Sequence, residues 1–165
     1  MKNSLLSLLV ASTLLLAGCG QKNESAAAAP ASTASTSAAT SSFELTANDS
    51  MKYNLTRLEV TAGQEVTVSL TNMGNIPKAA MGHNWVLLKK DADVKAFDDA
   101  AVMAAATEYF PTALAGQVIA HIKLLGPKQT DEVKFKAPTE PGEYPFLCTF
   151  PAHYAAGMKG VLVVK

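Results

Sequence analysis

The chain has 165 residues, and its 14 basic and 14 acidic side chains leave no formal net charge at pH 7. The charged residues form no run, and the absence of a basic stripe excludes a nucleic-acid-binding surface. The length allows one folded domain together with shorter flanking segments.

Residues 1–18 have the pattern of a secretory signal. A basic start at Lys2 precedes an apolar run from Leu5 to Leu16, which is too short to span a membrane. The sequence LLAGC that follows resembles the lipobox of bacterial lipoproteins, in which the signal is cleaved before the cysteine and the cysteine is acylated. This resemblance implies that Cys19 is the lipid-bearing first residue of the mature chain. The alternative is an ordinary signal peptide followed by a chance cysteine.

Residues 19–42 form a low-complexity segment made almost entirely of Ala, Ser and Thr after the first few positions. The segment has no apolar period and cannot bury enough surface to offset the entropy of ordering. We predict a disordered tether between the lipidated Cys19 and a single folded domain at residues 43–165. Gly20 stands where many lipoproteins retained at an inner membrane carry Asp, which favours an outer membrane.

Alternation of apolar and polar residues is the main signal in the folded domain. The sequence EVTVSL, for example, places Val66, Val68 and Leu70 on one face and polar side chains on the other. Turn sequences such as TAGQ, MGNIP, LGPKQ and TEPGE separate the strands. We expect strands at residues 43–48, 53–61, 65–70, 84–90, 118–125, 131–138, 142–148 and 158–164. About eight short strands with such turns predict an antiparallel β-sandwich.

One segment interrupts the strands. Residues 91–110 are rich in Ala, carry acidic residues early and stop before Pro111. This composition predicts a helical insertion, in one or two pieces. Its expected structural role is a flap over one edge or end of the sandwich.

Three potential metal ligands lie within eleven residues near the C-terminus. The sequence CTFPAHYAAGM places Cys148 at the end of one strand, His153 in a loop, and Met158 at the start of the next strand. His83 precedes another strand and needs only to lie at the same end of the sandwich. Two imidazoles and a thiolate in a trigonal set, with a long axial thioether, describe a blue copper electron-transfer site.

Each of these residues also has a purely structural interpretation. Cys148 would then be a small buried hydrophobe, His153 a surface side chain, Met158 part of the core, and His83 the start of a strand. Their common spacing favours the metal site. His121 lies in an expected strand without a partner motif and is predicted to be a non-ligand.

The sequences MGHNWVL, VIAHIKLLG and FLCTFPAHYAAGMKG resemble the azurins, within the cupredoxin family, over nearly the whole of residues 43–165. The resemblance implies an all-β fold, a Greek-key β-sandwich of about eight strands with a helical insertion. It also implies one copper ion, bound by His83, Cys148, His153 and Met158. The carbonyl of Gly82 is then expected near the metal on the opposite axial side.

The resemblance also assigns roles around the ligands. Backbone amides at Asn84 and Phe150 are expected to donate hydrogen bonds to the thiolate, and the Asn84 side chain to tie the two ligand loops together. Electrons are expected to pass at the exposed edge of His153. An apolar rim suited to brief redox encounters is implied around it, made of Met51, Met81, Phe150, Pro151 and Ala152, with Ala155 or Ala156 completing it. The alternative is a set of scattered surface hydrophobes.

Three features depart from the azurin pattern. The last ligands are spaced Cys-x4-His-x4-Met, whereas azurins usually have three residues before the methionine, and the longer loop resembles the auracyanins. Neither position that matches the azurin disulfide is a cysteine. Asn72 stands where many azurins carry a histidine beside the site, so we expect no proton-linked potential through that position.

These observations predict a carrier of single electrons and not an enzyme. Its expected partners are redox proteins such as c-type cytochromes or copper and haem reductases, at the periplasmic or outer surface of a bacterial membrane. A copper store or chaperone has the same ligands and is the alternative function. Copper enzymes need several more histidines than the three present here. A Cys-His hydrolase leaves the methionine unexplained, and structural zinc sites favour further Cys or His over Met.

Overall fold

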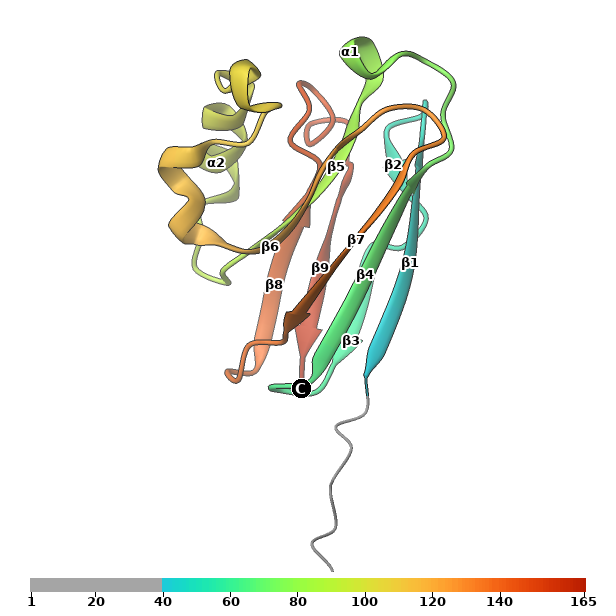
Figure 1. The fold of residues 1–165 in the computed structure, drawn as a ribbon. Coiled ribbons are helices and arrows are strands. Elements are labelled where there is room, and N and C mark those ends of the chain that lie inside the picture. The colour runs from blue at the N-terminus through green and yellow to red at the C-terminus, as the bar shows by residue number, and fades with distance from the viewer. Residues whose placement is uncertain (1–39) are drawn as a thin grey trace, which may run out of the picture. The chain divides into compact units, whose positions relative to one another are not determined.

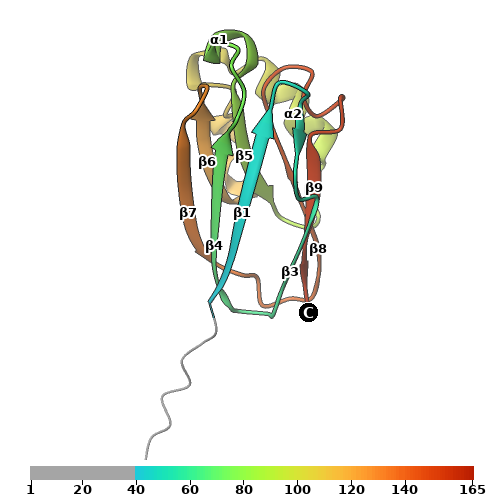
Figure 2. The same ribbon diagram turned by 90° about the vertical axis from the view of Figure 1, so that its right-hand side faces the viewer.

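Two β-sheets pack face to face in the computed structural model, which describes residues 40–165 (Figure 1). One sheet has the strand order β2-β1-β4-β7 and the other β3-β9-β8-β5-β6, and Figure 2 brings the first sheet towards the viewer. The strands are β1 (Ser41–Asn48), β2 (Lys52–Tyr53), β3 (Arg57–Val60), β4 (Glu65–Asn72), β5 (His83–Leu88), β6 (Val118–Leu125), β7 (Thr130–Lys136), β8 (Gly142–Leu147) and β9 (Lys159–Val164). The signal, Cys19 and nearly all of the predicted tether lie outside the described residues.

The β-sandwich is therefore observed, but its sheets are mixed, and the prediction of a purely antiparallel sandwich was wrong. β1 pairs with β4 in parallel, and β3 pairs with β9 in parallel. The strand expected at residues 53–61 is in fact divided into β2 and β3, because the chain crosses there from one sheet to the other. Alternation identifies the buried face of a strand, whereas the direction of its neighbour depends on long-range pairing.

β1 begins two residues before the expected start. Ser41 and Ser42 have no apolar side chain to bury, but their backbone pairs with Val66 and Thr67 of β4. The ladder of backbone hydrogen bonds thus extends the strand into the end of the segment predicted to be a tether.

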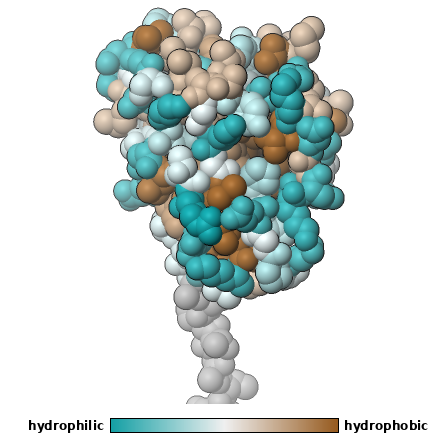
Figure 3. All heavy atoms as spheres, turned by 180° about the vertical axis from the view of Figure 1, so that it is seen from behind, coloured by the Kyte–Doolittle hydropathy of each residue, from teal (hydrophilic) through white to brown (hydrophobic). Residues whose placement is uncertain are grey.

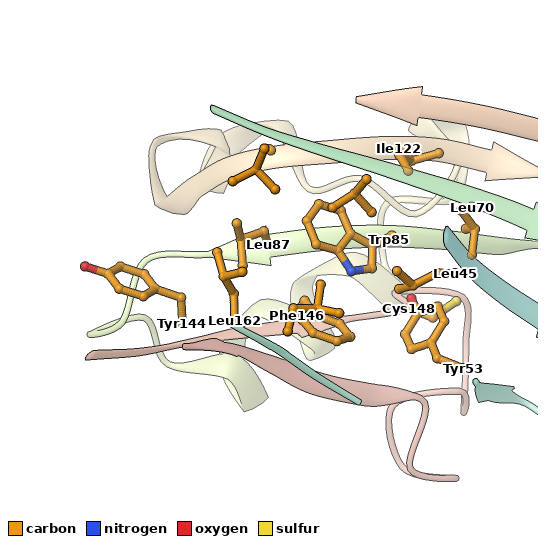
Figure 4. Close-up of a cluster of buried hydrophobic side chains, with 14 of the residues drawn as sticks. Leu45, Tyr53, Leu70, Trp85, Leu87, Ile122, Tyr144, Phe146, Cys148 and Leu162 are labelled. Atoms are coloured by element: carbon orange, nitrogen blue, oxygen red, sulfur yellow. The ribbon is translucent and has the colours of Figure 1, made fainter. Parts of the chain in front are cut away.

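The core lies between the two sheets. Leu45 and Leu70 from one sheet meet Trp85 and Phe146 from the other (Figure 4). The Trp85 ring centroid lies 5.6 Å from that of Phe146. Each large side chain buried in this way contributes about 1.5–3 kcal/mol to stability. The packed core makes a rigid support for the loops at the end of the sandwich.

The helical insertion covers a face of the five-stranded sheet. Helix α2 (Val94–Val102) begins where the Asp93 side chain accepts a hydrogen bond from the amide of Ala96 at 3.0 Å. Phe97 packs in a second apolar cluster whose other buried members are Val86, Leu88 and Leu147. The insertion was expected at an edge or end of the sandwich, and this prediction was wrong because the outward side of β5 is itself apolar.

Three further helical pieces complete the described chain. Helix η1 (Ala105–Thr107) follows α2, and η2 (Thr112–Gln117) begins after Pro111, where the insertion was expected to have ended. The short α1 (Lys78–Met81), which was not predicted, lies just before β5. α1 and the loop after β8 lie together at the top of Figure 1, at the end opposite the C-terminus.

The surface is mixed in character. From behind, hydrophilic residues dominate, the most apolar groups are small and separate, and moderately apolar groups gather near the top (Figure 3). Among residues 40–165, none of the helices combines the length and the apolar composition that crossing a membrane requires.

Candidate metal centre

Strand direction brings the predicted ligand segments together, because the start of β5 and the end of β8 lie at the upper end of the sandwich in Figure 1. β5 and β8 are antiparallel neighbours, so the start of β5 lies near the end of β8. His83 is the first residue of β5, and Cys148 follows the last residue of β8. The chain then forms a loop at residues 149–157 and returns in β9. The topology therefore brings two distant segments to one point.

His83, Cys148 and His153 form one buried cluster. One ligand atom from each lies within 4.8 Å of the others. The Cys148 sulfur lies 3.4 Å from Nδ1 of His153, and the two imidazole centroids are 4.9 Å apart. Neither ring nitrogen of His83 reaches strict hydrogen-bond geometry to a group in residues 40–165, although the backbone of Asn48 lies near enough to act on the imidazole. A buried imidazole nitrogen without a partner is costly, and a bound cation would satisfy one of the two.

The protonation states suit a soft metal ion. Burial raises the pKa of Cys148 to about 12, and the backbone amides of Asn84 and Phe150, which donate towards the sulfur, act in the opposite direction. Burial lowers the pKa of His153 to about 4, with a further lowering from His83. Burial also lowers the pKa of His83, which the Asp49 carboxylate and the backbone of Asn48 partly oppose.

Both imidazoles are therefore neutral at neutral pH, and their nitrogen lone pairs are available. Loss of the thiol proton on metal binding would leave Cys148 as a thiolate, and together with the two neutral imidazoles it would hold the ion. This donor set matches blue copper and lacks the additional Cys or His of a structural zinc site. The residues present thus fit a single copper ion.

Met158 lies next to this cluster and is fully buried. Its amide donates to the carbonyl of His153 at 2.9 Å, and its carbonyl accepts from the amide of Cys148 at 3.1 Å. These two bonds fix the backbones of the three residues relative to one another. Coordination by the Met158 thioether remains a prediction.

The loop between the ligands is closed by its own backbone. The amide of Ala156 donates to Ala152, and the amide of Gly157 donates to Tyr154, both at 2.9 Å. Ala152 has φ 71° and Gly157 has φ 94°. A left-handed residue other than glycine costs about 1–2 kcal/mol, so the surrounding bonds must hold Ala152 in place. This compact turn accommodates the four residues between His153 and Met158.

Gly82 is buried directly before His83. A Cβ atom at this position would lie 2.8 Å from Leu124 Cγ and 2.9 Å from the carbonyl oxygen of Lys78. Any other residue at this position would clash with the Leu124 side chain and the Lys78 carbonyl. A weak axial contact from the Gly82 carbonyl remains a prediction.

The residues that follow two of the ligands are joined through their side chains. Asn84 Nδ2 donates to Thr149 Oγ1 at 2.7 Å, and the Thr149 amide donates to Asn84 Oδ1 at 2.8 Å. Thr149 Oγ1 in turn donates to the carbonyl of Tyr109, at 2.7 Å. The ligand segments and the helical insertion thus share one polar network.

The predicted apolar rim is partly accessible. Ala152 and Ala155 are exposed, whereas Met51, Met81, Pro151 and Ala156 are half-buried and Phe150 is buried. His153 itself is only 1% exposed, so the prediction of an exposed imidazole edge was wrong. Its ring lies against that of Phe150, with the centroids 4.8 Å apart. Loop residues cover the imidazole, which spacing along the chain could not reveal.

Two other polar residues lie outside the cluster. His121 is exposed and stacks on Phe110 with centroids 4.5 Å apart. Asn72 is buried, donates to the carbonyl of Leu125 at 3.2 Å and accepts from the amide of Gly74 at 2.8 Å. Cys148 is a free cysteine, the only one within residues 40–165.

Sequence reasoning missed three residues that contact the ligand segments. Besides Thr149, these are Tyr53, whose hydroxyl donates to the carbonyl of Asn84, and Lys52, whose ammonium donates to the carbonyl of Ala156. Thr149 could have been noticed as the neighbour of Cys148. No local signal indicates the long-range partners of Lys52 and Tyr53.

Comparison with known proteins agrees with this geometry. Residues 39–165 match the plastocyanin/azurin family of copper binding proteins, and the chain therefore belongs to that family. The fold and the site together define a copper-binding cupredoxin with one ion site built on His83, Cys148 and His153, with Met158 nearby.

The relatives include azurins and auracyanins. An azurin of Achromobacter denitrificans is 40% identical over 118 residues, which cover 70% of this chain and 78% of the relative. An azurin of Pseudomonas aeruginosa is 37% identical over 131 residues, which cover 78% of this chain and 87% of the relative. The crystal structure of an auracyanin from Roseiflexus castenholzii has a TM-score of 0.68 at 37% identity and covers 76% of this chain and 97% of its own. The likeness to azurin and the auracyanin-like features are both confirmed.

Proposed function

We propose that this protein is a blue copper electron carrier that passes single electrons between redox proteins on the extracytoplasmic side of a bacterial membrane. The observation that carries the proposal is the buried convergence of the Cys148 thiol with the imidazoles of His83 and His153. Copper bound by such a donor set supplies one-electron chemistry between Cu(I) and Cu(II).

The protein holds the donor atoms in fixed positions and keeps water away from them. His83 and Cys148 are attached to neighbouring strands of one sheet, and Met158 is tied by its backbone to both Cys148 and His153. All four side chains are at most 1% exposed. A site that cannot relax or admit water keeps nearly the same geometry in both oxidation states, which lowers the cost of each electron transfer.

Electron exchange is proposed to occur over the loop that covers His153. Ala152 and Ala155 are exposed there and Pro151 is half-buried, so a partner can approach a small apolar surface. Small contacts of this kind suit transient redox encounters. The proposed partners are c-type cytochromes or copper and haem reductases.

All three histidines of the chain are accounted for, because His121 stands apart from the other two. We therefore propose a carrier and not a copper enzyme.

Localisation is proposed from the N-terminal sequence. Acylation at Cys19 would anchor the protein in a membrane, and we propose the outer membrane, with the domain facing the periplasm or the cell surface. If residues 20–40, which precede β1, behave as a flexible coil, they give the domain a mean reach on the order of 25 Å.

The function is tested by loading the protein with copper and mixing its oxidised form with a reduced c-type cytochrome in a stopped-flow spectrometer. We expect an intense blue absorption that bleaches reversibly as the cytochrome is oxidised. A blue protein that exchanges no electrons with cytochromes or small redox mediators would be a copper store. A pale complex would contradict the thiolate site itself.

A further inference from the structure

Strand β2 consists of only two residues, yet each of them contacts a different segment of the metal centre. Tyr53 points into the core and Lys52 points outward. Tyr53 reaches the segment that carries His83, and Lys52 reaches the loop between His153 and Met158. We infer that β2 is a two-point clamp of the copper site, in which Tyr53 and Lys52 are positioning residues for the ligands. This inference rests on the proposed copper function.

The inner contact is made by the Tyr53 hydroxyl. Tyr53 is 5% exposed, and its hydroxyl donates to the carbonyl of Asn84, the residue after His83. The amide of Asn84 donates towards the Cys148 sulfur, so this one residue receives a bond from Tyr53 and gives one to the ligand. Figure 4 shows the Tyr53 ring beside the Cys148 side chain.

The Tyr53 hydroxyl is held in a donating position. A carbonyl oxygen only accepts hydrogen bonds, so the phenol donates its proton to the carbonyl of Asn84. Its ring packs edge-on against Phe146 with centroids 5.7 Å apart, which fixes the direction of the hydroxyl.

The outer contact is made by the Lys52 ammonium. It donates to the carbonyl of Ala156, near the end of the turn that begins at Ala152. A Cβ atom at Gly157 would lie 2.7 Å from Lys52 Nζ, so the absence of a side chain at Gly157 leaves room for the ammonium. Charged donors to carbonyls at the end of such a turn are favourable. Met158 follows directly after this point.

Strand pairing fixes the position of the two clamp residues, Tyr53 and Lys52. Ala47 of β1 pairs with Tyr53, and Asn48 pairs with Lys52, so both clamp residues belong to one hairpin. β1 itself is held along its length by β4. Both ligand segments are therefore held by the same four-stranded sheet. This sheet contributes none of the three clustered ligands.

The experiment first compares amide hydrogen exchange in the copper-free full chain. Tyr53→Phe removes only the hydroxyl, and we expect the amides of Asn84 and Thr149 to exchange roughly tenfold faster. Lys52→Met keeps the length of the side chain but removes the donor, and we expect the amides of Ala156, Gly157 and Met158 to exchange about threefold faster. This effect is smaller than that of Tyr53→Phe because the Lys52 contact is exposed to water.

Two matched variants serve as controls. Tyr144→Phe removes a hydroxyl that donates to a backbone carbonyl, that of Glu140, at 2.8 Å and away from the ligands. Lys128→Met removes a lysine that donates to the carbonyl of Met73 at 2.8 Å without contact to the ligand loop. Neither control is expected to change exchange at the ligand segments. Lys52→Arg keeps the charge, and we expect the loop amides of this variant to exchange as slowly as those of the wild type.

The same variants are then loaded with copper and compared by electron paramagnetic resonance and by the rate of copper release to a chelator. We expect broadened or shifted copper signals and severalfold faster release for Tyr53→Phe and Lys52→Met, and wild-type behaviour for both controls. Unchanged exchange and release in both clamp variants would overturn the inference. A change in the controls as large as in the clamp variants would also overturn it. None of these measurements involves a redox partner, so they are independent of the test of electron transfer.

Discussion

Asn84 and Thr149, 65 residues apart, hold each other through two hydrogen bonds, with donor–acceptor distances of 2.7 and 2.8 Å. Each follows a predicted copper ligand, His83 in one case and Cys148 in the other. Both residues are at most 2% exposed, so the bonds are protected from water. This pair joins the residues that follow His83 and Cys148 through side-chain hydrogen bonds.

Replacing Asn84 with Ala is expected to weaken the fold and the site together. The Thr149 amide would be left buried without its acceptor, which costs about 1–3 kcal/mol, and loss of the side-chain volume adds to this. Urea denaturation of the copper-free protein would measure the loss. Asn54→Ala is the matched control, because the Asn54 side chain also forms two hydrogen bonds, in its case both with main-chain groups, but is exposed. Equal losses in the two variants would contradict the role assigned to the Asn84–Thr149 pair.

Cys148→Ser keeps the size of the side chain but removes the soft anionic ligand. The intense blue band should disappear, because it requires charge transfer from a thiolate to Cu(II). Electron exchange should fall severely. Absorption spectra at equal protein concentration, with the copper content measured separately, provide the check. Survival of the blue band would show that Cys148 is not the ligand that produces it.

Met158 is the predicted axial ligand, and its substitutions should move the potential in opposite directions. Met158→Leu removes a weak donor to Cu(II) while preserving the apolar volume, so the colour should remain and the potential should rise. Met158→Gln supplies an amide oxygen that favours Cu(II), so the potential should fall. For one electron, ~60 mV corresponds to about 1.4 kcal/mol, so protein-film voltammetry would resolve a modest change. Identical potentials in wild type and both variants would make Met158 only a core residue.

Asp98 on α2 should make stability depend on pH. It is buried, its Oδ1 has no hydrogen-bond partner within the described part of the chain, and burial raises its pKa, as does Asp99, while Lys95 opposes this. A raised pKa in the folded state means that the ionised carboxylate destabilises the fold at pH values above that pKa. This penalty vanishes as the pH falls below the pKa of the unfolded state.

Asp98→Asn is therefore expected to stabilise the protein by on the order of 1 kcal/mol at pH 7. The advantage should shrink as the pH falls and disappear in acid, where the wild-type carboxyl is also neutral. Thermal unfolding from pH 7 down to pH 3 would follow it, with Asp91→Asn as a control at an exposed position. A gain that does not change with pH would show that ionisation of Asp98 is not the cause.

The anchor is tested at Cys19. Cys19→Ala should release or misprocess the protein without preventing the domain from folding and binding copper, because the described domain starts well after this position. Mass spectrometry of the membrane-bound wild type should show an acylated N-terminal cysteine. A mature N-terminus elsewhere, without acyl groups, would refute the lipoprotein prediction.

The sequence by itself determined the local features of this protein. Alternation identified the inward residues of β4 and β8, including Phe146, and the inward position of Cys148 directly after β8, because side chains on a strand alternate between two faces. The spacing of Cys148, His153 and Met158 predicted a donor set that suits copper better than zinc, and the structure brings Cys148 and His153 together with His83. These signals depend only on neighbouring positions, and for that reason a single sequence contains them.

The tertiary structure alone decided how distant segments meet. The parallel pairing of β1 with β4, the division of residues 53–61 between two sheets and the position of α2 on a sheet face all depend on contacts far along the chain. The same is true of the covered ring of His153 and of the bonds from Lys52 and Tyr53 to the ligand segments. Such contacts arise when two sheets bury a common core, and no periodicity within one segment contains that information.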